Sequence, residues 1–486
     1  MGPEFSRRSF LLGTTSLGLA WLLPSFAQAQ NELRFETPLA IPAVLEGTIN
    51  EGVREHDLTL QSGISEFFKG YDTPTWGING AYLGPLLKMR KGETVRVNVT
   101  NTLDETTTLH WHGFNLPAEA DGGPHQPIHP GKTWSPEFKV LESAGLMWAH
   151  AHQMGKTAEH VWNGLATMVM IEDEDSDTLD LPNTYGVDDI PVVLQDRRFK
   201  RDGSIPYALS MHDRMAGMMG HVPLLNGTVL PYVDVKADRM RLRLLNGANA
   251  SIYNLSFDDG RSFHQIGSDG GLLQAPVELT ELRLAPGERA DIVVDFSDGK
   301  PCKMISQSRG NGMEMMEQSP NFLLLEFRVA ENRTPSPDLP SRLADLAPAS
   351  TENVKNTRTF LLEMPSMGPQ MMMGFPFSIN GQEMDMARID ETVPVGQDEI
   401  WVIQNAGPMA HPFHVHNTQF RILSRNGQPP APNEQGRKDT VLVEPEEEVR
   451  ILIRFDHYTD PKRPYMYHCH ILEHEDAGMM GQFVVV

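Results

Sequence analysis

Near its end, the 486-residue sequence reads His468-Cys469-His470-Ile471-Leu472-Glu473-His474-Glu475-Asp476-Ala477-Gly478-Met479. His474 and Met479 follow Cys469 closely, and His411 is available from an earlier predicted strand. A thiolate, two imidazoles and a weak thioether form the trigonal ligand set of a blue-copper site, whereas zinc would gain little from the thioether. The stretch therefore predicts a mononuclear copper site.

Cys469 stands between two further histidines, His468 and His470. Successive side chains of a strand point to opposite faces, so the thiol faces one way and both imidazoles face the other. An electron taken up at a thiolate-bound copper would need only one residue of backbone to reach a histidine-bound metal. The spacing therefore predicts two kinds of metal site joined by a short covalent path.

Histidines also occur in His-x-His pairs in the first and last thirds of the chain. The pairs are His110-Trp111-His112, His150-Ala151-His152, His414-Val415-His416 and His468-Cys469-His470. Residues i and i+2 of a strand share a face about 7 Å apart, at about 3.3 Å per residue. Nitrogens so spaced cannot easily chelate one ion at about 2 Å, but each can serve a different ion. Four such pairs predict eight ligands around several adjacent metals.

A strand–turn–strand pattern recurs three times along the chain. Its first strand is predicted at residues 94–99, 240–245 and 399–403, and leads into Asn101, Asn246 and Asn405. Its second strand follows a turn and is predicted within residues 130–140, 286–296 and 445–455. Short alternating apolar runs broken by Gly, Pro, Asn and Asp are typical of antiparallel sheets. Three copies predict an all-β chain of three Greek-key sandwiches.

Composition shifts divide this all-β chain into segments. An acidic linker is predicted near residues 172–182, and a linker rich in Pro, Ser and Asn near residues 330–357. We therefore expect domains at residues 30–175, 183–330 and 355–486, of which the middle one holds no copper ligands. No later segment is long and apolar enough to span a bilayer.

The N-terminal residues 1–29 are typical of a twin-arginine signal peptide. Arg7 and Arg8 precede an apolar stretch at residues 11–23 and a small-residue cleavage site ending at Ala29. We expect the twin-arginine export machinery to move the folded protein to the periplasm. Whether residues 1–5 are native is not decided by the sequence.

The formal charge of -23 argues against two classes of partner. So negative a field disfavours nucleic acid and an anionic membrane surface. Of the two cysteines, Cys469 lies among histidines, which leaves Cys302 as a lone thiol predicted to be buried and inert. Disulfide chemistry is therefore not expected to organise the fold.

Taken together, the four histidine motifs resemble those of the multicopper oxidases over the whole mature chain. The resemblance is greatest to bacterial periplasmic cuprous oxidases and laccase-like enzymes, and it implies three cupredoxin-like domains. It implies four copper ions: a type 1 ion held by His411, Cys469, His474 and Met479; a type 2 ion held by His110 and His414; one type 3 ion held by His112, His150 and His470; and a second held by His152, His416 and His468. The family oxidises its substrate one electron at a time and reduces O2 to water.

Two carboxylates, Asp121 and Glu475, match acids that resemble the family's proton donors. Reducing O2 to water consumes protons in a site otherwise lined by neutral imidazoles, so nearby acids are needed. Asp121 precedes two glycines and could instead only form a turn. Glu475 could instead form a surface ion pair.

Methionines cluster between residues 364 and 386, where Pro and Gly interrupt any helical stripe. The candidates for handling copper(I) are Met364, Met367, Met371, Met372 and Met373, together with Met409. Thioethers are soft ligands that select copper(I), but methionine is also an adaptable core residue. The Met-rich segment is shorter than in similar cuprous oxidases, and Gly407 stands where their acidic residue is expected.

The expected reducing substrate is therefore copper(I), a phenol or an aromatic amine, with O2 as acceptor and a role in copper tolerance. We expect a monomer. Three other hypotheses remain open: a non-enzymatic scaffold at the cell envelope that has lost its coppers, a copper nitrite reductase, and a copper-sequestering protein. A nitrite reductase would not need four His-x-His pairs, and the complete ligand set argues against a copper-free scaffold.

Overall fold

Strands make up most of the ordered structure, as the short alternating runs of apolar residues predict. The computed structural model describes residues 34–309, 320–364 and 377–486. Helices in this described part are short: α2 (Thr157–Asn163), α3 (Glu174–Asp177), α4 (Met211–Ala216) and α5 (Leu472–Asp476). None of them has the length and apolar character that crossing a bilayer requires.

Two predictions concern residues outside this described part. The signal peptide predicted for residues 1–29 is one of them. The other concerns four of the candidate copper(I) ligands, Met367, Met371, Met372 and Met373. Both stay predictions from the sequence.

The first sandwich consists of a six-stranded and a five-stranded sheet. The six-stranded sheet contains β3 (Thr48–Asn50), β4 (Val53–Ser65), β5 (Thr73–Ile78), β7 (Thr94–Asn101), β9 (Thr133–Trp134) and β10 (Glu137–Lys139). The five-stranded sheet contains β2 (Val44–Leu45), β6 (Leu86–Arg90), β8 (His110–His112), β11 (Gly145–His150) and β12 (Ala166–Glu172). Buried apolar side chains of both sheets, such as Val97 and Val169, join in one core.

The second sandwich consists of a six-stranded and a seven-stranded sheet. The first contains β1 (Thr37–Pro38), β16 (Pro231–Ala237), β18 (Tyr253–Phe257), β21 (Leu282–Leu284), β23 (Cys302–Ser306) and β24 (Phe322–Thr334). The second contains β13 (Asp189–Arg197), β14 (Val222–Leu225), β15 (Thr228–Val229), β17 (Arg239–Asn246), β19 (Phe263–Ser268), β20 (Gly271–Leu279) and β22 (Arg289–Asp295). Since β1 pairs with β16, the strand at residues 37–38 runs along this sandwich. The predicted domain boundaries stay predictions.

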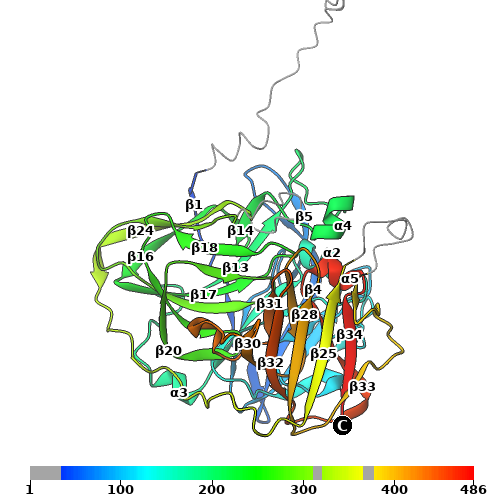
Figure 1. Ribbon diagram of the computed structural model, residues 1–486. Helices are drawn as coiled ribbons and strands as arrows, with labels where there is room; N and C mark the ends of the chain where they lie inside the picture. Colours follow the sequence, from blue (N-terminus) through cyan, green and yellow to red (C-terminus); the bar gives the residue numbers. More distant parts are fainter. Residues whose placement is uncertain (1–33, 310–319, 365–376) are drawn as a thin grey trace, which may run out of the picture. The chain divides into compact units, whose positions relative to one another are not determined.

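The third sandwich consists of two five-stranded sheets. One contains β25 (Asn356–Glu363), β26 (Ser378–Ile379), β28 (Asp398–Asn405), β30 (Arg421–Arg425) and β32 (Glu448–Arg454). The other contains β27 (Glu391–Val393), β29 (His411–Val415), β31 (Thr440–Val443), β33 (Asp460–Cys469) and β34 (Met480–Val485). The strands of this sandwich are the yellow to red arrows of Figure 1.

The repeated strands found in the sequence pair in all three sandwiches. β7 pairs antiparallel with β10, β17 with β22, and β28 with β32. The first copy departs from the prediction of one continuous second strand, because β9 and β10 are separate. Pro136, which lies between them, has no N–H to donate to a ladder. The prediction of an all-β fold of three cupredoxin-like sandwiches is confirmed.

An asparagine closes the turn after the first strand of each repeat. The carboxamide oxygens of Asn101, Asn246 and Asn405 each accept the backbone N–H two residues ahead, at 2.9, 3.0 and 2.9 Å. Each Nδ2 donates to a carbonyl in the loop that follows and to a second carbonyl 27, 38 or 38 residues away. The same three hydrogen bonds of one asparagine side chain therefore fix the same turn, called here the asparagine corner, in every domain.

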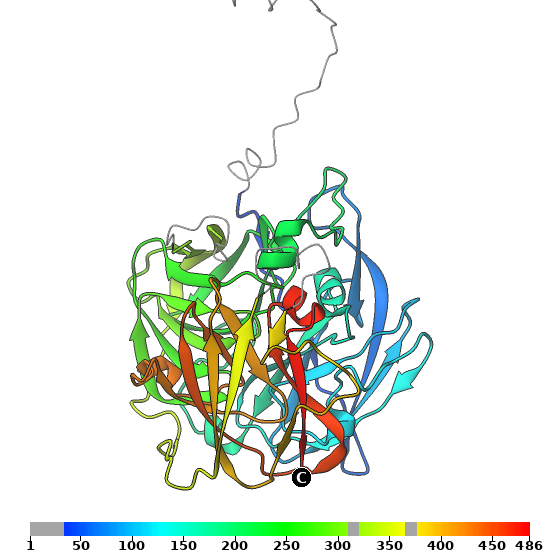
Figure 2. The ribbon, with the colours of Figure 1, turned by 45° about the vertical axis from the view of Figure 1, so that its right-hand side comes forward.

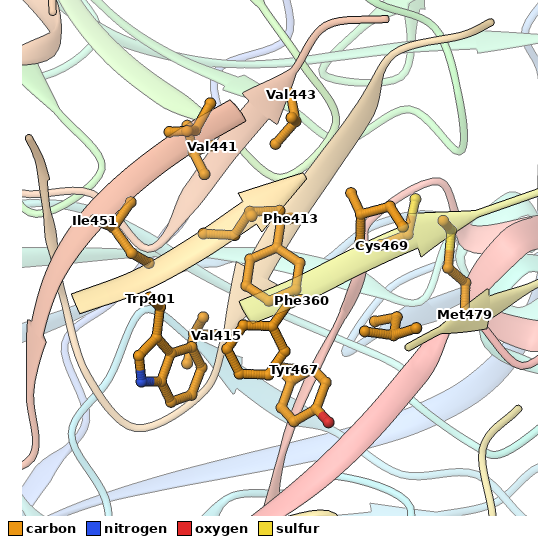
Figure 3. Packing of buried hydrophobic residues seen from close by; sticks show 14 of the residues in the cluster. Phe360, Trp401, Phe413, Val415, Val441, Val443, Ile451, Tyr467, Cys469 and Met479 are labelled. Carbon is orange, nitrogen blue, oxygen red and sulfur yellow. The ribbon is translucent and has the colours of Figure 1, made fainter. Parts of the chain in front are cut away.

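Cys469 belongs to the hydrophobic core of the third sandwich. Phe360 and Trp401 lie with ring centroids 4.6 Å apart, and Phe360 and Tyr467 with centroids 4.8 Å apart. Figure 3 shows this aromatic group between the two sheets, with Cys469 and Met479 at its edge and their sulfur atoms turned toward the same space. Close-packed rings leave little freedom to the strand that ends at Cys469.

The first and third sandwiches meet edge to edge. Figure 2 shows the blue and cyan strands of the first beside the orange and red strands of the third. Hydrogen bonds cross between them, such as Tyr465 Oη to the carbonyl of Leu116 at 2.8 Å and the Leu116 N–H to the carboxamide of Asn417 at 3.0 Å. The histidine pairs of both sandwiches lie at this junction.

Candidate metal centre

Strand pairing brings the four His-x-His pairs together. In the first sandwich β8 pairs with β11, so that His110 lies opposite His150. In the third sandwich β29 pairs with β33, so that His414 lies opposite His468. Each pair thus lies at or just beyond the end of a strand, and all eight rings are buried.

The eight imidazoles form three groups whose ligand atoms lie within 4.8 Å of one another. The groups are His110, His414 and His416; His112, His150 and His470; and His152, His416 and His468. The last two match the two type 3 sets expected from the resemblance, and the first contains the expected type 2 pair with His416 in addition. Three of the four pairs divide their two histidines between different groups, as strand geometry predicts.

The rings stack across the junction between the sandwiches. His110 and His416 have centroids 3.7 Å apart with planes 18° from parallel, and His112 and His414 have centroids 3.7 Å apart with planes 10° from parallel. Each stack joins a ring of the first sandwich to a ring of the third. The cluster is therefore completed only when both domains are folded and docked.

Backbone carbonyls orient half of these rings through Nδ1. His110 donates to the carbonyl of Asp121 at 2.8 Å, His150 to that of Ala151 at 2.9 Å and His414 to that of Asp439 at 2.8 Å. Their Nε2 atoms are buried without a hydrogen-bond partner. A hydrogen bond from one ring nitrogen fixes the tautomer and leaves the other nitrogen free to bind a metal.

His112 has the opposite orientation. Its Nε2 lies 2.9 Å from a carboxylate oxygen of Asp439, while its Nδ1 is buried without a partner. A carboxylate accepts but does not donate, so Nε2 carries the proton and Nδ1 is the free ligand atom. This difference between neighbouring histidines cannot be inferred from sequence spacing.

The ring nitrogens without hydrogen-bond partners test whether metal ions fit this cluster. Buried polar atoms without partners are rare, and here they converge: His470 has two such nitrogens, and His110, His112, His150 and His414 have one each. The Nε2 atom of His468 lies 3.2 Å from Nε2 of His152 and 3.3 Å from Nε2 of His416. Two ligands each about 2.0–2.3 Å from one ion stand about this far apart, so the donors fit metal ions.

Burial also keeps these imidazoles neutral. The pKa of His110, His150 and His470 lies well below the usual value, first because burial penalises the charged ring and then because neighbouring histidines repel a second charge. Burial alone lowers the pKa of His411 to about 3. Neutral imidazole is the form that binds a metal, so the ligands are ready near neutral pH.

A separate group surrounds Cys469. Its Sγ lies 3.5 Å from Nδ1 of His411 and 3.8 Å from Nδ1 of His474. The Ile471 N–H donates to the same sulfur at 3.4 Å. Met479 is fully buried, and its carbonyl accepts the Cys469 N–H at 3.0 Å. A sulfur, two imidazoles and a nearby thioether are the donors that blue copper uses.

His474 is held from both sides by residues distant in sequence. Its Nε2 donates to the carbonyl of Met215 at 3.0 Å, at the end of α4. The ring of Phe377 stacks on it with centroids 4.0 Å apart and planes 20° from parallel. The contact with Met215 brings the second sandwich to the cysteine group, although none of the described residues of that domain belongs to the group.

Asp121 and Glu475 both reach the histidine groups. Asp121 Oδ2 accepts a hydrogen bond from Nδ1 of His416 at 2.9 Å. The carboxylate oxygens of Glu475 lie 3.3 Å from Nδ1 of His152 and 3.2 Å from Nδ1 of His468, without the alignment of a hydrogen bond. Burial raises the pKa of both acids well above its usual value. Glu475 is 1% exposed, so a surface ion pair is excluded for it.

Three residues of the site carried no signal in the sequence. The carboxylate of Asp439 contacts His112 of the cluster. Arg289 from the second sandwich donates two hydrogen bonds to the same carboxylate. Gly287 has φ +85°, and a Cβ there would lie 2.9 Å from the ring of His470. In the sequence the Pro-Gly turn before residue 289 stands out only as part of a repeat, because nothing in its composition points to metal chemistry.

Of the candidate copper(I) ligands, the structure describes Met364 and Met409. Met409 is buried in the core of the third sandwich, against which the partly buried Met364 also packs. A Cβ added at Gly407 would lie 3.4 Å from the sulfur of Met364. The absence of a side chain at residue 407 therefore leaves room for this thioether.

Comparisons with known proteins agree with this arrangement. Family models described as multicopper oxidase match residues 60–176 and 352–486. The multicopper oxidase mco of Staphylococcus haemolyticus is 36% identical over 464 residues, which cover 94% of this chain and 93% of that protein. The cell division protein FtsP of Escherichia coli is 34% identical over 487 residues, which cover 99% of each chain.

Solved structures show the same relationship. A laccase-like multi-copper oxidase, CueO, from a lignin-degrading Ochrobactrum species superposes with a TM-score of 0.84 at 37% identity, covering 92% of this chain and 100% of that one. A multi-copper oxidase from Pediococcus acidilactici superposes with a TM-score of 0.83 at 39% identity, covering 93% and 92%. This chain belongs to the multicopper oxidase family.

Proposed function

We propose that this protein is an active copper oxidase that couples one-electron oxidation of a reducing substrate to reduction of O2. Each O2 would take four electrons and four protons and yield two waters. The observation that carries the proposal is the complete donor set: three buried histidine groups and one cysteine group, with unpartnered nitrogens facing inward. A chain that only kept the fold would have no reason to keep these buried donors.

The proposed complement is four copper ions. His411, Cys469, His474 and Met479 would hold type 1 copper, His110 and His414 type 2 copper, and the two remaining groups the type 3 pair. Bound there, the ions supply one-electron chemistry toward the donor and four-electron chemistry toward O2. The peptide from Cys469 to its neighbours His468 and His470 would be the electron path.

Asp121 and Glu475 are proposed as the proton donors. Both are buried acids within 3.3 Å of a ring nitrogen of the clusters. Their raised pKa values favour the protonated form, which is the form a proton donor must have. The two acids approach different histidines, His416 for Asp121 and both His152 and His468 for Glu475.

The reducing substrate is proposed to be copper(I), a phenol or an aromatic amine. Met364 and Met409, both packed in the third domain, favour copper(I), because thioethers prefer the soft ion. Gly407 offers no carboxylate to that ion. The Ochrobactrum relative has oxidase activity toward lignin model compounds and lignosulfonate, which supports an aromatic donor.

Counting copper and recording the absorption spectrum tests the proposal. We expect about four coppers per chain and an intense blue band. Cys469→Ser should lose the band, one copper and oxidation of every organic donor, because a hydroxyl is a poor soft ligand. Full turnover in this variant would contradict the type 1 assignment.

The similarity to the cell division protein FtsP supports a second candidate, a role in cell division rather than in oxidation. A purified chain that holds no firm copper and oxidises neither copper(I) nor phenols would favour that role. We also propose export to the periplasm through the twin-arginine machinery, which Arg7→Lys combined with Arg8→Lys should block. Unchanged export of that variant would contradict the predicted leader.

A further inference from the structure

Arg289 lies where the three sandwiches meet, and it is 1% exposed. From the start of β22 its Nε donates to the carbonyl of Leu146 in the first sandwich at 3.0 Å. Its Nη1 donates to the carbonyl of Gly287 in its own domain at 2.8 Å and to Asp439 of the third at 2.7 Å. Its Nη2 donates to the second carboxylate oxygen of Asp439. One guanidinium therefore ties all three domains at the histidine cluster.

Asp439 connects Arg289 to the histidine cluster. The oxygen that faces Nη1 of Arg289 also accepts the Nε2 proton of His112 at 2.9 Å. The backbone carbonyl of Asp439 accepts Nδ1 of His414 at 2.8 Å. His112 and His414 form one of the two stacks across the junction, so one aspartate orients both rings of that stack.

Asp439 lies on the side of these two rings that faces away from their free ligand nitrogens. Its carboxylate oxygen is 2.9 Å from Nε2 of His112 and 3.7 Å from Nδ1 of His414, whereas the unpartnered nitrogens are Nδ1 of His112 and Nε2 of His414. A partner that binds the outer nitrogen of a ring fixes its tautomer and orientation without binding the metal. Asp439 therefore sets which nitrogen of each ring is the ligand atom.

Close packing prevents the guanidinium from shifting. Gly113, with φ +91°, ends the first histidine pair, and a Cβ there would lie 2.7 Å from Nη2 of Arg289 and 2.7 Å from Oδ2 of Asp439. Only glycine leaves the space in which these groups meet. Farther out, Asp269 accepts the Arg289 N–H at 2.7 Å and pairs with the ammonium of Lys438 at 3.0 Å.

From this geometry we infer that Arg289 is a positioning residue for the metal cluster. It holds Asp439 in the position where its carboxylate accepts the Nε2 proton of His112 and its carbonyl accepts the Nδ1 proton of His414. Nδ1 of His112 and Nε2 of His414 are thereby left to face the metal. The middle domain, none of whose described residues belongs to a ligand group, thereby sets which nitrogen of His112 and His414 is the ligand atom. The inference rests on the proposed copper function.

The test compares Arg289→Gln and Arg289→Lys with the unmodified protein, each loaded with copper. We expect the cluster copper to be removed at about 10–100-fold lower chelator concentration, the usual cost of losing a group that orients a ligand. The hyperfine splitting of type 2 copper in the electron paramagnetic resonance spectrum should change in both variants. The blue band should remain, because the hydrogen bonds of the Arg289 guanidinium go to Leu146, Gly287, Asp439, Met147 and Asp269 and not to Cys469 or its two histidines.

A double variant separates positioning from packing. Arg289→Gln combined with Asp439→Asn removes the buried carboxylate charge that Arg289 no longer neutralises, while the Asn oxygen can still accept the His112 proton. We expect this variant to recover cluster copper relative to Arg289→Gln alone. A double variant no better than the single one would overturn the inference.

Arg243→Gln is the matched control. Arg243 is also buried in the second sandwich, and it forms a bidentate pair with Asp189 at 2.7 and 2.7 Å. It should lower the melting temperature and leave the copper spectra unchanged. Unaltered copper retention and spectra in both Arg289 variants would overturn the inference. A lack of firm copper in the unmodified protein would instead overturn the proposed function.

Discussion

At the scale of single residues, the two acids at Glu473 and Glu475 can be told apart by their contacts. Glu475 faces two histidines of the cluster, whereas Glu473 accepts hydrogen bonds from Asn249 at 2.9 Å and Tyr207 at 3.2 Å. Both lie on α5 and both are buried. Of these two glutamates, only Glu475 is therefore close enough to the cluster to be a proton donor.

Glu475→Gln should slow reoxidation of the fully reduced enzyme by O2 by about 100-fold, in the range that general acid catalysis contributes. The amide keeps the shape of the side chain but has no proton of comparable acidity to transfer. Stopped-flow recovery of the blue band measures this rate. Glu473→Gln is the control and should reoxidise normally, and equal rates in the two variants would exclude the proposed proton path.

Buried histidines also make the metal-free protein sensitive to acid. Burial lowers the pKa of His411 to about 3 and that of His468 to about 4. Between these values and the ordinary value near 6.5 the unfolded chain binds more protons than the folded one, so stability falls as pH falls.

We therefore expect the free energy of unfolding of the metal-free protein to decrease progressively from about pH 6.5 to about pH 4. Urea unfolding across this interval measures it. Replacing His468 with Gln should flatten part of the slope, because one neutral buried imidazole no longer has to gain a proton on unfolding. A pH-independent midpoint would contradict the expectation.

At the scale of elements, the asparagine corners after β7, β17 and β28 are the features that the three domains share most closely. The carboxamide of Asn246 is fully buried, donates to the carbonyls of Ser251 and Leu284 at 2.8 Å each, and accepts the N–H of Ala248 at 3.0 Å. These bonds hold together the strands that precede Gly287 and Arg289.

Asn246→Ala should destabilise the protein by about 2–4 kcal/mol, since each buried polar group left without a partner costs about 1–3 kcal/mol. Differential scanning calorimetry measures the loss. Asn246→Asp keeps the acceptor and loses the donors, so it separates the two contributions. A change below about 0.5 kcal/mol in Asn246→Ala would show that water replaces the lost bonds.

At the scale of the whole molecule, copper would join the first and third sandwiches. His112 and His150 come from the first and His470 from the third, and other groups are divided in the same way. A ligand that binds only the folded state stabilises it by about 4 kcal/mol when its free concentration exceeds Kd a thousandfold. Metal binding and domain docking are therefore expected to be coupled.

Removing copper with a chelator should lower the melting temperature by several degrees and expose the junction between the two sandwiches to protease. Calorimetry and limited proteolysis, before and after copper is restored, check both effects. Cys469→Ser, which should lack only type 1 copper, is expected to lose less stability than the metal-free protein. Identical melting temperatures with and without copper would contradict the coupling.

Much of the fold could be read from local patterns. Alternation over residues 94–99, 240–245 and 399–403 places strands correctly, because side-chain direction in a strand depends only on local backbone geometry. The same period of two explains why His468 and His470 enter different groups from Cys469. Spacing along one strand is a property of the sequence alone.

The tertiary structure alone decides which distant groups meet. Three features depend on the docking of three sandwiches. His112 faces the cluster with Nδ1, Asp439 contacts both His112 and His414, and Arg289 closes the site from a domain whose described residues belong to no ligand group. The bonds from Asp439 to His112 and to Arg289 join residues 150 or more positions apart. Local periodicity carries no information on such contacts, because they are fixed by side-chain packing across domain surfaces rather than by backbone repeat.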